Sequence, residues 1–307
     1  MHTAARKLAI GISSFRSDKQ ALALVKKIVE LQIDFEWLFV VDSQGSEELG
    51  QRIADIGDPR IRHYAEQKNI GSAGNLCRRL EISSQLGADW LLAFNHDAPV
   101  SAPAVAALLA VASEAVDWGA LYPLRFEEGR GRYDLSGTRW FPYGFRGVLE
   151  PPKTDLTPVY WGSSNGALYS LAAVRKGIIP QASLWMGWED YLFGLTLERA
   201  GWHQWLIRNS EIGDSYEFRK RGIAGVELTV SDKPCWYYYY AVRNLILSHV
   251  HLQPSMRGMA NLAAWLPVYG LRVIAFPGQC SRRRAFLNFL EGLVDGIMGR
   301  KGKWRLP

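Results

Sequence analysis

Short apolar runs that stop at small or polar residues divide the first hundred residues of the chain. Runs of this length, bounded by polar residues and glycines, are typical of strands covered on both faces. Four of them predict strands, at residues 7–12, 35–41, 61–64 and 90–97. Stretches with helical spacing follow the first three, at about 19–31, at 47–56 and from residue 75 to about 86. Strands and helices that alternate in this order predict a parallel, Rossmann-like sheet.

The fourth run ends in three polar residues, Asn95, His96 and Asp97. Ligands of open α/β sheets bind at the carboxyl ends of the strands, so Asp97 is a candidate for the central carboxylate of a site. A structural reading stays open, because Pro99 follows and Asp97 could turn the chain and cap the next helix.

Polar residues also follow the first two runs. Ser13, Phe15 and Arg16 lie in the loop after the first run. Asp42 closes the second run, where a carboxylate can accept hydrogen bonds from a ribose or a base. It could equally cap the helix predicted at 47–56.

A glycine-containing segment precedes the third helix and carries Asn69, Gly71 and Asn75. Glycines at a helix start leave backbone N–H groups free to face a phosphate. The segment is neither a P-loop nor a GxGxxG fingerprint. Glycines before a helix are also ordinary turn chemistry, so both readings stay open.

The composition suits a packed globular chain of 307 residues, 48% hydrophobic, with a formal net charge of +6. This charge admits an anionic partner, such as a phosphorylated substrate, an acidic membrane or nucleic acid. No helix-turn-helix, RNP-type or zinc pattern accompanies it, so we expect no nucleic-acid partner. Cys77, Cys235 and Cys280 are odd in number and lack metal spacing, which predicts ordinary buried thiols in a reducing compartment. Residues 1–6 lack the apolar core of a signal peptide.

In their order along the chain, these features resemble the family 2 glycosyltransferases of the GT-A fold, which bind nucleotide-activated sugars. The more specific matches are the segment 69–75 and the sequence Trp188-Glu189-Asp190-Tyr191. Together with the strand ends and a segment that begins at Gly166, they cover roughly residues 7–216. The resemblance implies an α/β fold in which a Rossmann-like mixed sheet is flanked by helices, with a helical extension after it.

The resemblance also implies roles for individual residues. Asp190 would deprotonate the acceptor hydroxyl, and Glu189 beside it would orient the acceptor or the base. Asp97, and Asp214 where relatives often carry a histidine, would hold Mg²⁺ or Mn²⁺. The nucleotide-binding set is Ser13, Phe15, Arg16, Asp42, Asn69, Gly71, Asn75 and Asn95. The acceptor-binding set is Trp161, Asn165, Gly166 and Trp188. As an alternative, two acids at 189–190 could simply complement a helix dipole.

The chain departs from the family pattern in three places. Asn95 stands where the family has the first residue of an aspartate-x-aspartate motif. Ser13-Ser14-Phe15 replaces the usual Thr-Tyr-Asn, and the turn after Asp42 is one residue longer. These changes bear on which donor binds more than on the fold.

Between the two halves, residues 125–158 form a long connection rich in glycine, proline, arginine and aromatic residues. A connection of this length predicts a functional flap, whose arginines and rings suit phosphate contacts and sugar stacking. The interleaved residues are Arg130, Arg132, Tyr133, Arg139, Trp140, Phe141, Tyr143 and Arg146.

Helical patterns dominate from residue 231. We therefore predict a GT-A catalytic domain at 1–230, with a nucleotide-binding half at about 7–100 and an acceptor half at about 101–230, and a helical segment at 231–307. The pattern Tyr239-Tyr240-x-x-Arg243-Asn244 resembles the rhamnosyltransferase-like and galactofuranosyltransferase-like branch.

Two features near the end of the chain bear on membranes. Residues 258–271 are apolar but too short to span a bilayer, which predicts a core helix. Arg282, Arg283 and Arg284, together with basic residues in 300–305, flank apolar positions. They form either an interfacial surface for anionic lipid or solvated charges.

The leading expectation is an inverting, metal-dependent glycosyltransferase. It would move a sugar from a nucleoside-diphosphate sugar, such as dTDP-rhamnose or UDP-galactofuranose, to a hydroxyl of a glycan, glycolipid or small acceptor. This reaction needs a base, because the acceptor hydroxyl must lose its proton, and a divalent cation, because the charge of the leaving diphosphate must be neutralised. The alternative is a non-catalytic nucleotide-sugar-binding module. We expect a cytoplasmic protein, with peripheral contact to an anionic membrane and a homo-oligomer left open.

Overall fold

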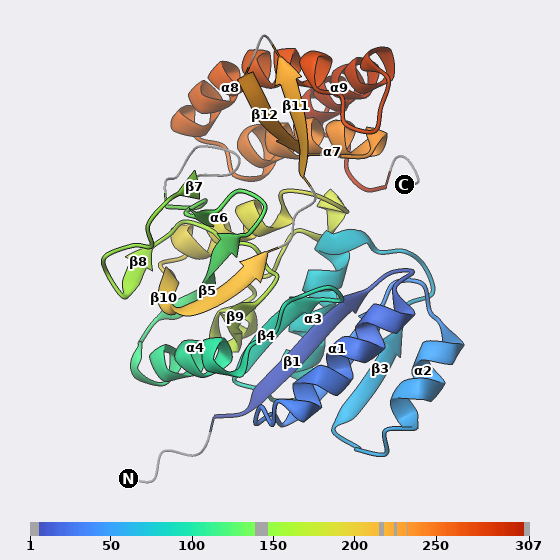
Figure 1. Ribbon diagram of the computed structural model, residues 1–307, viewed down its shortest axis with the longest axis vertical. Coiled ribbons are helices and arrows are strands. Elements are labelled where there is room, and N and C mark those ends of the chain that lie inside the picture. The colour runs from blue at the N-terminus through green and yellow to red at the C-terminus, as the bar shows by residue number, and fades with distance from the viewer. Residues whose placement is uncertain (1–5, 139–146, 215–217, 224–225, 232, 304–307) are drawn as a thin grey trace.

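A computed structural model describes residues 6–138, 147–214, 218–223, 226–231 and 233–303 (Figure 1). The parallel half of its main sheet is built from β1 (Leu8–Ser14), β2 (Trp37–Asp42), β3 (Ile61–Ala65) and β4 (Trp90–Asn95). The remaining strands are β5 (Trp118–Glu127), β6 (Arg132–Asp134), β7 (Gly147–Val148), β8 (Leu156–Pro158), β9 (Ala167–Ser170), β10 (His203–Asp214), β11 (Phe218–Ile223) and β12 (Val226–Ser231).

The helices alternate with the strands in the first half and follow one another at the end of the chain. They are α1 (Asp18–Glu30), α2 (Glu47–Ala54), α3 (Gly71–Gln85), α4 (Ala102–Glu114), α5 (Leu171–Arg175), the 3₁₀ helix η1 (Ala182–Leu184), α6 (Glu189–Arg199), α7 (Cys235–Ile246), the π-helical η2 (Leu247–Leu252), α8 (Met256–Ala275) and α9 (Arg282–Ile297). The strands and helices predicted for the first hundred residues are confirmed to within a few residues at their ends.

The main sheet runs in the order β3-β2-β1-β4-β9-β5-β10-β8. Strands β1 to β4 are mutually parallel, whereas β9 runs antiparallel to both of its neighbours, β4 and β5. Since β10 is parallel to β5, the carboxyl ends of β1, β2, β4, β5 and β10 all lie along the same edge of the sheet. The mixed sheet flanked by helices, with helices after it, confirms the predicted fold class.

Two apolar layers cover the faces of this sheet. Apolar residues of α1, α2 and α4, such as Val25, Leu49 and Leu108, pack on one face. Residues of α3 and α6, such as Leu80 and Phe193, pack on the other. The helix α6 therefore rests on the sheet, with its first residues next to the edge where the strands end.

A third apolar cluster joins the end of the chain to α6. Tyr191 and Leu195 of α6 pack in one cluster with Val242 and Leu245 of α7 and Phe289 of α9. In Figure 1 the helices α7, α8 and α9 form the end of the molecule farthest from β3. The helical segment predicted at 231–307 thus packs directly on the helix that carries Glu189 and Asp190.

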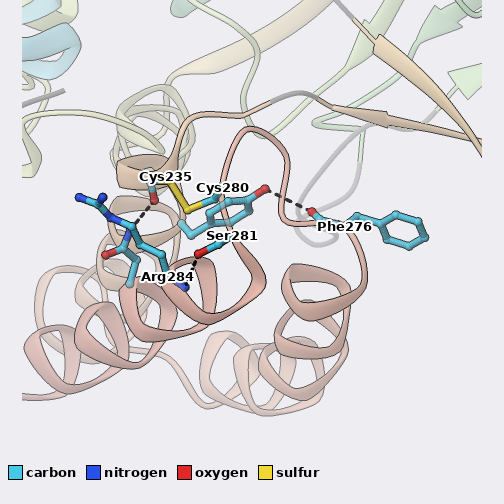
Figure 2. The surroundings of a disulfide bond; sticks show 7 residues. Cys235, Phe276, Cys280, Ser281 and Arg284 are labelled. Carbon is cyan, nitrogen blue, oxygen red and sulfur yellow. Dashed lines mark hydrogen bonds between the residues drawn. A yellow bond between two sulfur atoms is a disulfide. The ribbon is translucent and has the colours of Figure 1, made fainter.

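Two of the three cysteines form a disulfide bond, so the prediction of three ordinary thiols is wrong for them. Cys235 at the start of α7 is bonded to Cys280, which lies between α8 and α9 (Figure 2). Asn288 of α9 also donates a hydrogen bond of 2.7 Å to the carbonyl of Cys235. The inference of a reducing compartment loses its basis, because disulfides persist mainly in oxidising surroundings.

The helix α8 corrects a second expectation. Leu262, Gly270 and Val273 are buried, but the opposite face of the helix is open to solvent, so α8 is not the core helix predicted from its apolar sequence. No helix among the described residues is long and apolar enough to cross a membrane.

The described part of the connection 125–158 is more regular than a flap. It contains the end of β5 and the short strands β6, β7 and β8, and Tyr133 of β6 packs against Phe126 of β5 with 5.1 Å between ring centroids. Three residues of the set predicted to bind phosphate and stack on a sugar lie in this described part, namely Arg130, Arg132 and Tyr133. Five residues of the predicted stacking set lie outside the described residues, namely Arg139, Trp140, Phe141, Tyr143 and Arg146.

Candidate active site

The loop 163–166, just before β9, connects the two halves of the site. The side-chain oxygen of Asn165 accepts a 2.9 Å hydrogen bond from the backbone N–H of Asn95, and the hydroxyl of Ser13 donates to Asn95 Oδ1 over 3.1 Å. Gly166 follows with φ +84° and donates its N–H to the carbonyl of Ala93 over 2.7 Å. Ser13, Asn95, Asn165 and Gly166, assigned from the sequence to both sides of the site, therefore lie in direct contact.

Asp190 lies at the N-terminus of α6, against the same loop. Its Oδ2 accepts the backbone N–H of Ser164 at 3.2 Å, while its Oδ1 is shielded from solvent and has no hydrogen-bond partner among the described residues. Burial raises the pKa of Asp190 above its ordinary value of 3.8, although hydrogen bonds from Ser164 and the charges of Arg125 and Arg79 oppose the rise. A carboxylate with a raised pKa and an oxygen that accepts no hydrogen bond is suited to take a proton.

Glu189 is the more deeply buried acid of the pair. Burial, and next the charge of Asp190, raise the pKa of Glu189 from 4.5 to about 7, against a hydrogen bond from the side chain of Ser72. Because Ser72 lies in the first turn of α3, this bond links α6 to the glycine-containing segment. Two neighbouring acids with raised pKa values fit a proton-handling site better than a pair of dipole-complementing acids, whose charged forms would be favoured.

Arg79 of α3 is a buried cation that the sequence analysis missed. Its Nη1 donates to the carbonyls of Gly11 in β1 and Phe94 in β4, at 3.2 and 3.0 Å. Burial lowers the pKa of Arg79 to about 10, which leaves it protonated at neutral pH, and the charges of Asp190 and Glu189 oppose that drop. The one available signal was Gly11, since a strand glycine marks close approach of another group. A Cβ there would lie 3.1 Å from Arg79 Cδ.

The loop before α6 is held by two buried residues of α7. Asn244 Nδ2 donates to the carbonyls of Leu184, Met186 and Gly187 at 3.1, 2.6 and 2.8 Å. Arg243 Nη2 donates to the carbonyl of Leu184 at 2.7 Å. The Arg-Asn pair noted in the sequence thus acquires a physical role, because it fixes the backbone that leads into Glu189.

Aromatic side chains surround the start of α6. Trp188 adopts φ +64° just before the helix, and its ring centroid lies 6.4 Å from that of Trp161. Tyr191 lies 5.6 Å from Trp161 and 6.0 Å from Trp188. The two tryptophans predicted to bind the acceptor are therefore neighbours, and both are only partly buried. Edge-to-face rings of this kind can also stack on a sugar.

Asp42 is fully buried and organises the turn that follows β2. Its two oxygens accept the backbone N–H groups of Gln44 and Ser46 at 3.0 and 2.6 Å, and Nε2 of His63 lies 3.5 Å away. Although burial acts in the opposite direction, these hydrogen bonds and His63 lower the pKa of Asp42 below 3.8. The cap of α2 is Ser46 and not Asp42. A contact from Asp42 to a nucleotide stays a prediction.

The segment 69–75 is tied to the loop before α6. Gly71 donates its N–H to Asn69 Oδ1 at 2.9 Å, and Ala73 donates its N–H to the carbonyl of Trp185 at 3.1 Å. A Cβ on Gly71 would lie 2.0 Å from that carbonyl oxygen, so only glycine fits. Asn75 donates to the carbonyl of Val41 at 2.9 Å. Two N–H groups expected to face a phosphate thus bond within the protein.

Phe15 and Arg16 lie in the loop after β1. Arg16 is exposed, has φ +54°, and its guanidinium lies 5.0 Å from the ring centroid of Phe15. This backbone conformation is uncommon for a residue other than glycine. The contact of either residue with a nucleotide stays a prediction.

The residues proposed for a divalent cation offer oxygen donors. Asp97 is exposed in the turn after β4, and Asp214 ends β10 on the same edge of the sheet, with its side chain outside the described set. No group of three metal-binding side chains occurs in the part of the chain described. Mg²⁺ is often bound through one or two carboxylates, with water and substrate phosphates completing its shell, so this donor set fits such an ion.

Comparison with solved structures identifies the type of fold. No protein-family model and no curated protein sequence matches the chain. Residues 1–349 of TarS from S. aureus superpose with a TM-score of 0.57 at 12% identity, over 95% of this chain and 81% of that one. A mannosyltransferase from Pyrobaculum calidifontis, in complex with GDP-Man and Mn²⁺, gives 0.55 at 11% identity, over 96% and 88%. The chain has the GT-A fold. TarS 1–349 in complex with UDP gives 0.53 at 12% identity, over 95% and 92%.

Proposed function

We propose that this GT-A chain is a glycosyltransferase that moves a sugar from a nucleoside-diphosphate sugar to an acceptor hydroxyl with inversion at the anomeric carbon. The observation that carries the proposal is the chain of contacts from Asp190 through Ser164 and Asn165 to Asn95. It places an acid with a raised pKa one loop away from the edge of the sheet where nucleotides bind in open α/β folds.

In this proposal Asp190 accepts the proton of the acceptor hydroxyl as the new glycosidic bond forms. The positive charges of Arg79 and Arg125 oppose the rise in its pKa and so favour the ionised carboxylate in this buried place. Glu189 is a positioning residue that orients its neighbour, and Trp161 and Trp188 bind the acceptor. Two observations support this division of roles, namely the Oδ1 of Asp190, which is unpaired in the described part of the chain, and the link of Glu189 to Ser72.

On the donor side, we propose that Ser13, Phe15, Arg16, Asp42, Asn69, Gly71, Asn75 and Asn95 bind or position the nucleotide. Asp97 and Asp214 would hold Mg²⁺ or Mn²⁺, which when bound neutralises the diphosphate oxygens. The mannosyltransferase complex with GDP-Man and Mn²⁺ supports a divalent cation here.

The donor and the acceptor are the finer part of the proposal. The Tyr-Tyr-x-x-Arg-Asn pattern favours dTDP-rhamnose or UDP-galactofuranose, and the UDP complex of TarS favours a uridine nucleotide. The acceptor would be a glycan, a glycolipid or a small hydroxyl compound. A family 2 assignment, a cytoplasmic location, membrane contact, an envelope polysaccharide as product and a homo-oligomer stay predictions.

The test is release of nucleoside diphosphate from a panel of dTDP-, UDP- and GDP-sugars, each with and without Mn²⁺ and acceptor. We expect one donor to be turned over with Mn²⁺, and Asp97→Ala to lose the Mn²⁺-dependent release without loss of folding, since Asp97 is exposed. Binding of a donor without any release would identify a nucleotide-sugar-binding module instead. Unchanged Mn²⁺ dependence in Asp97→Ala would remove Asp97 from the metal site.

A further inference from the structure

The helices α8 and α9 present apolar side chains to solvent in unusual number. Of the seventeen large hydrophobic side chains that are exposed in the described residues, eleven lie between Met256 and Met298. We call six of them the outer face, namely Val268, Leu271 and Ile274 of α8 and Leu290, Val294 and Ile297 of α9. Leu271 is 70% exposed and Ile297 is 60% exposed. So many exposed apolar side chains on two helices that pack together are typical of an interaction surface.

The outer face is not required to hold the helices in place. The opposite side of α9 packs so closely on α7 that a Cβ on Gly292 would lie 2.4 Å from the carbonyl oxygen of Tyr239. The disulfide between Cys235 and Cys280 fixes the turn before α9 as well (Figure 2). Since Leu290, Val294 and Ile297 recur at spacings of four and three residues, they form one stripe on the side of α9 that faces away from α7.

The positive charge of the protein is concentrated in the part of the sequence that carries this face. Residues 251–307 contain nine Lys or Arg and two Asp or Glu, a net charge of +7, whereas the rest of the chain is at −1. Of the two acids, Asp295 is buried and is bonded to Arg300 and Tyr239. Arg272 on α8 and Arg282, Arg283 and Arg284 at the start of α9 are exposed.

We propose that the outer face docks on the surface of an anionic lipid bilayer, with α8 and α9 lying in its interface. An apolar face rimmed by arginines is the pattern of interfacial helices, in which apolar side chains enter the headgroup region and cations bind acidic lipids. In Figure 1 both helices lie at the end of the molecule opposite β3, so the main sheet would lie on the side away from the bilayer.

The charges favour a bilayer over a second copy of the chain. In a two-fold symmetric dimer the same patch faces itself, so a basic rim would meet a basic rim. An anionic surface instead complements every exposed arginine of the rim. Docking on a bilayer would bring a lipid-linked acceptor close to the site. Only this consequence of the proposal rests on the proposed function.

The experiment is sedimentation of the full chain with vesicles of phosphatidylcholine alone or mixed with phosphatidylglycerol. We expect binding to the anionic vesicles, weakened by salt, and little binding to the neutral ones. Leu271→Glu and Leu290→Glu should each lower the partition by about tenfold, the value of one buried leucine. Val116→Glu is the matched control, because Val116 is 78% exposed on a distant loop. Arg283→Gln should lower binding about fivefold, and Lys26→Gln on α1 should not.

The outcomes separate this proposal from the proposed function. Equal binding to neutral and anionic vesicles, or no binding at all, would overturn it. So would a dimer, seen by sedimentation velocity without lipid, that Leu271→Glu dissociates. Release of nucleoside diphosphate is measured in parallel with a soluble acceptor and should be the same in Leu271→Glu and the wild type. Vesicle binding without any release of nucleoside diphosphate would support docking on the bilayer and contradict the proposed glycosyl transfer.

Discussion

The turn after β2 and the start of α6 each bury an acid, and their surroundings act on the two acids in opposite directions. Around Asp42, two backbone N–H groups and His63 outweigh burial and lower its pKa. Around Asp190, burial outweighs the N–H of Ser164 and two arginine charges, and the pKa rises. A carboxylate whose charged form is held by hydrogen bonds stabilises a turn, whereas one with a raised pKa and an unpaired oxygen is suited to exchange a proton. Under the proposed function, Asp42 has a structural role in its turn and Asp190 has a chemical one.

The largest expected effect tests the catalytic role proposed for Asp190. Asp190→Asn keeps the shape of the side chain and should keep donor affinity, while transfer falls by about 10²- to 10⁴-fold, the usual contribution of a general base. Single-turnover kinetics and calorimetric donor binding check the two parts. Glu189→Gln is the control and should be milder. A loss of donor affinity with unchanged kcat would make Asp190 a ground-state binding residue.

The second effect concerns Arg79, the buried cation whose charge acts on Asp190 and Glu189. Arg79→Met removes two hydrogen bonds from a charged donor and should lower the free energy of unfolding by about 2–4 kcal/mol. Since the positive charge opposes the rise in the pKa of Asp190, its loss should also move the ascending limb of the pH–rate profile to higher pH. Arg79→Lys, which keeps the charge, should restore the profile more than the stability. An unshifted profile in Arg79→Met would reduce Arg79 to a purely structural role.

The third effect is a pH slope of stability. The folded-state pKa of Glu189 is about 7 against an ordinary 4.5, so the folded protein holds a proton that the unfolded chain releases between these values. Stability should therefore fall as the pH rises from about 4.5 to about 7, by up to a few kcal/mol, and then level off. Urea titrations across this window should show a flatter slope for Glu189→Gln. The same slope in variant and wild type would contradict the assignment.

The smallest effect tests the structural side. Because the folded-state pKa of Asp42 is lowered, its contribution to stability is present above pH 3.8 and is lost as the pH falls below that value. Asp42→Asn should cost about 1–2 kcal/mol at neutral pH and abolish this acid-side loss. Calorimetry on the folded variant shows whether nucleoside diphosphate also binds more weakly. An unchanged affinity would exclude a direct contact.

The sequence predicted the strands and the sheet edge well, because buried strands carry a local apolar signal and their last residues define that edge. The structure places Asp42 at the end of β2, as predicted, and Asp190 in the first turn of α6. Asp97 was predicted to end a strand but lies in the turn two residues after β4. It could not predict Arg79, since an arginine in a helix looks solvated until its strand neighbours are known. Nor could it show that the apolar residues of α8 face outward, because periodicity reveals an apolar face and not what covers it.

The hydrogen bonds from Arg243 and Asn244 to the loop 184–187 limit where this protein can be truncated or joined to another chain. A polypeptide ending at residue 230 would contain the whole sheet, Glu189 and Asp190, yet the four carbonyl contacts that shape the approach to α6 would be gone. We therefore expect that the helical segment can be exchanged between GT-A chains only if it brings a matching arginine and asparagine. Chimaeras joined near residue 231 should be designed with α6, its preceding loop and α7 taken from one parent.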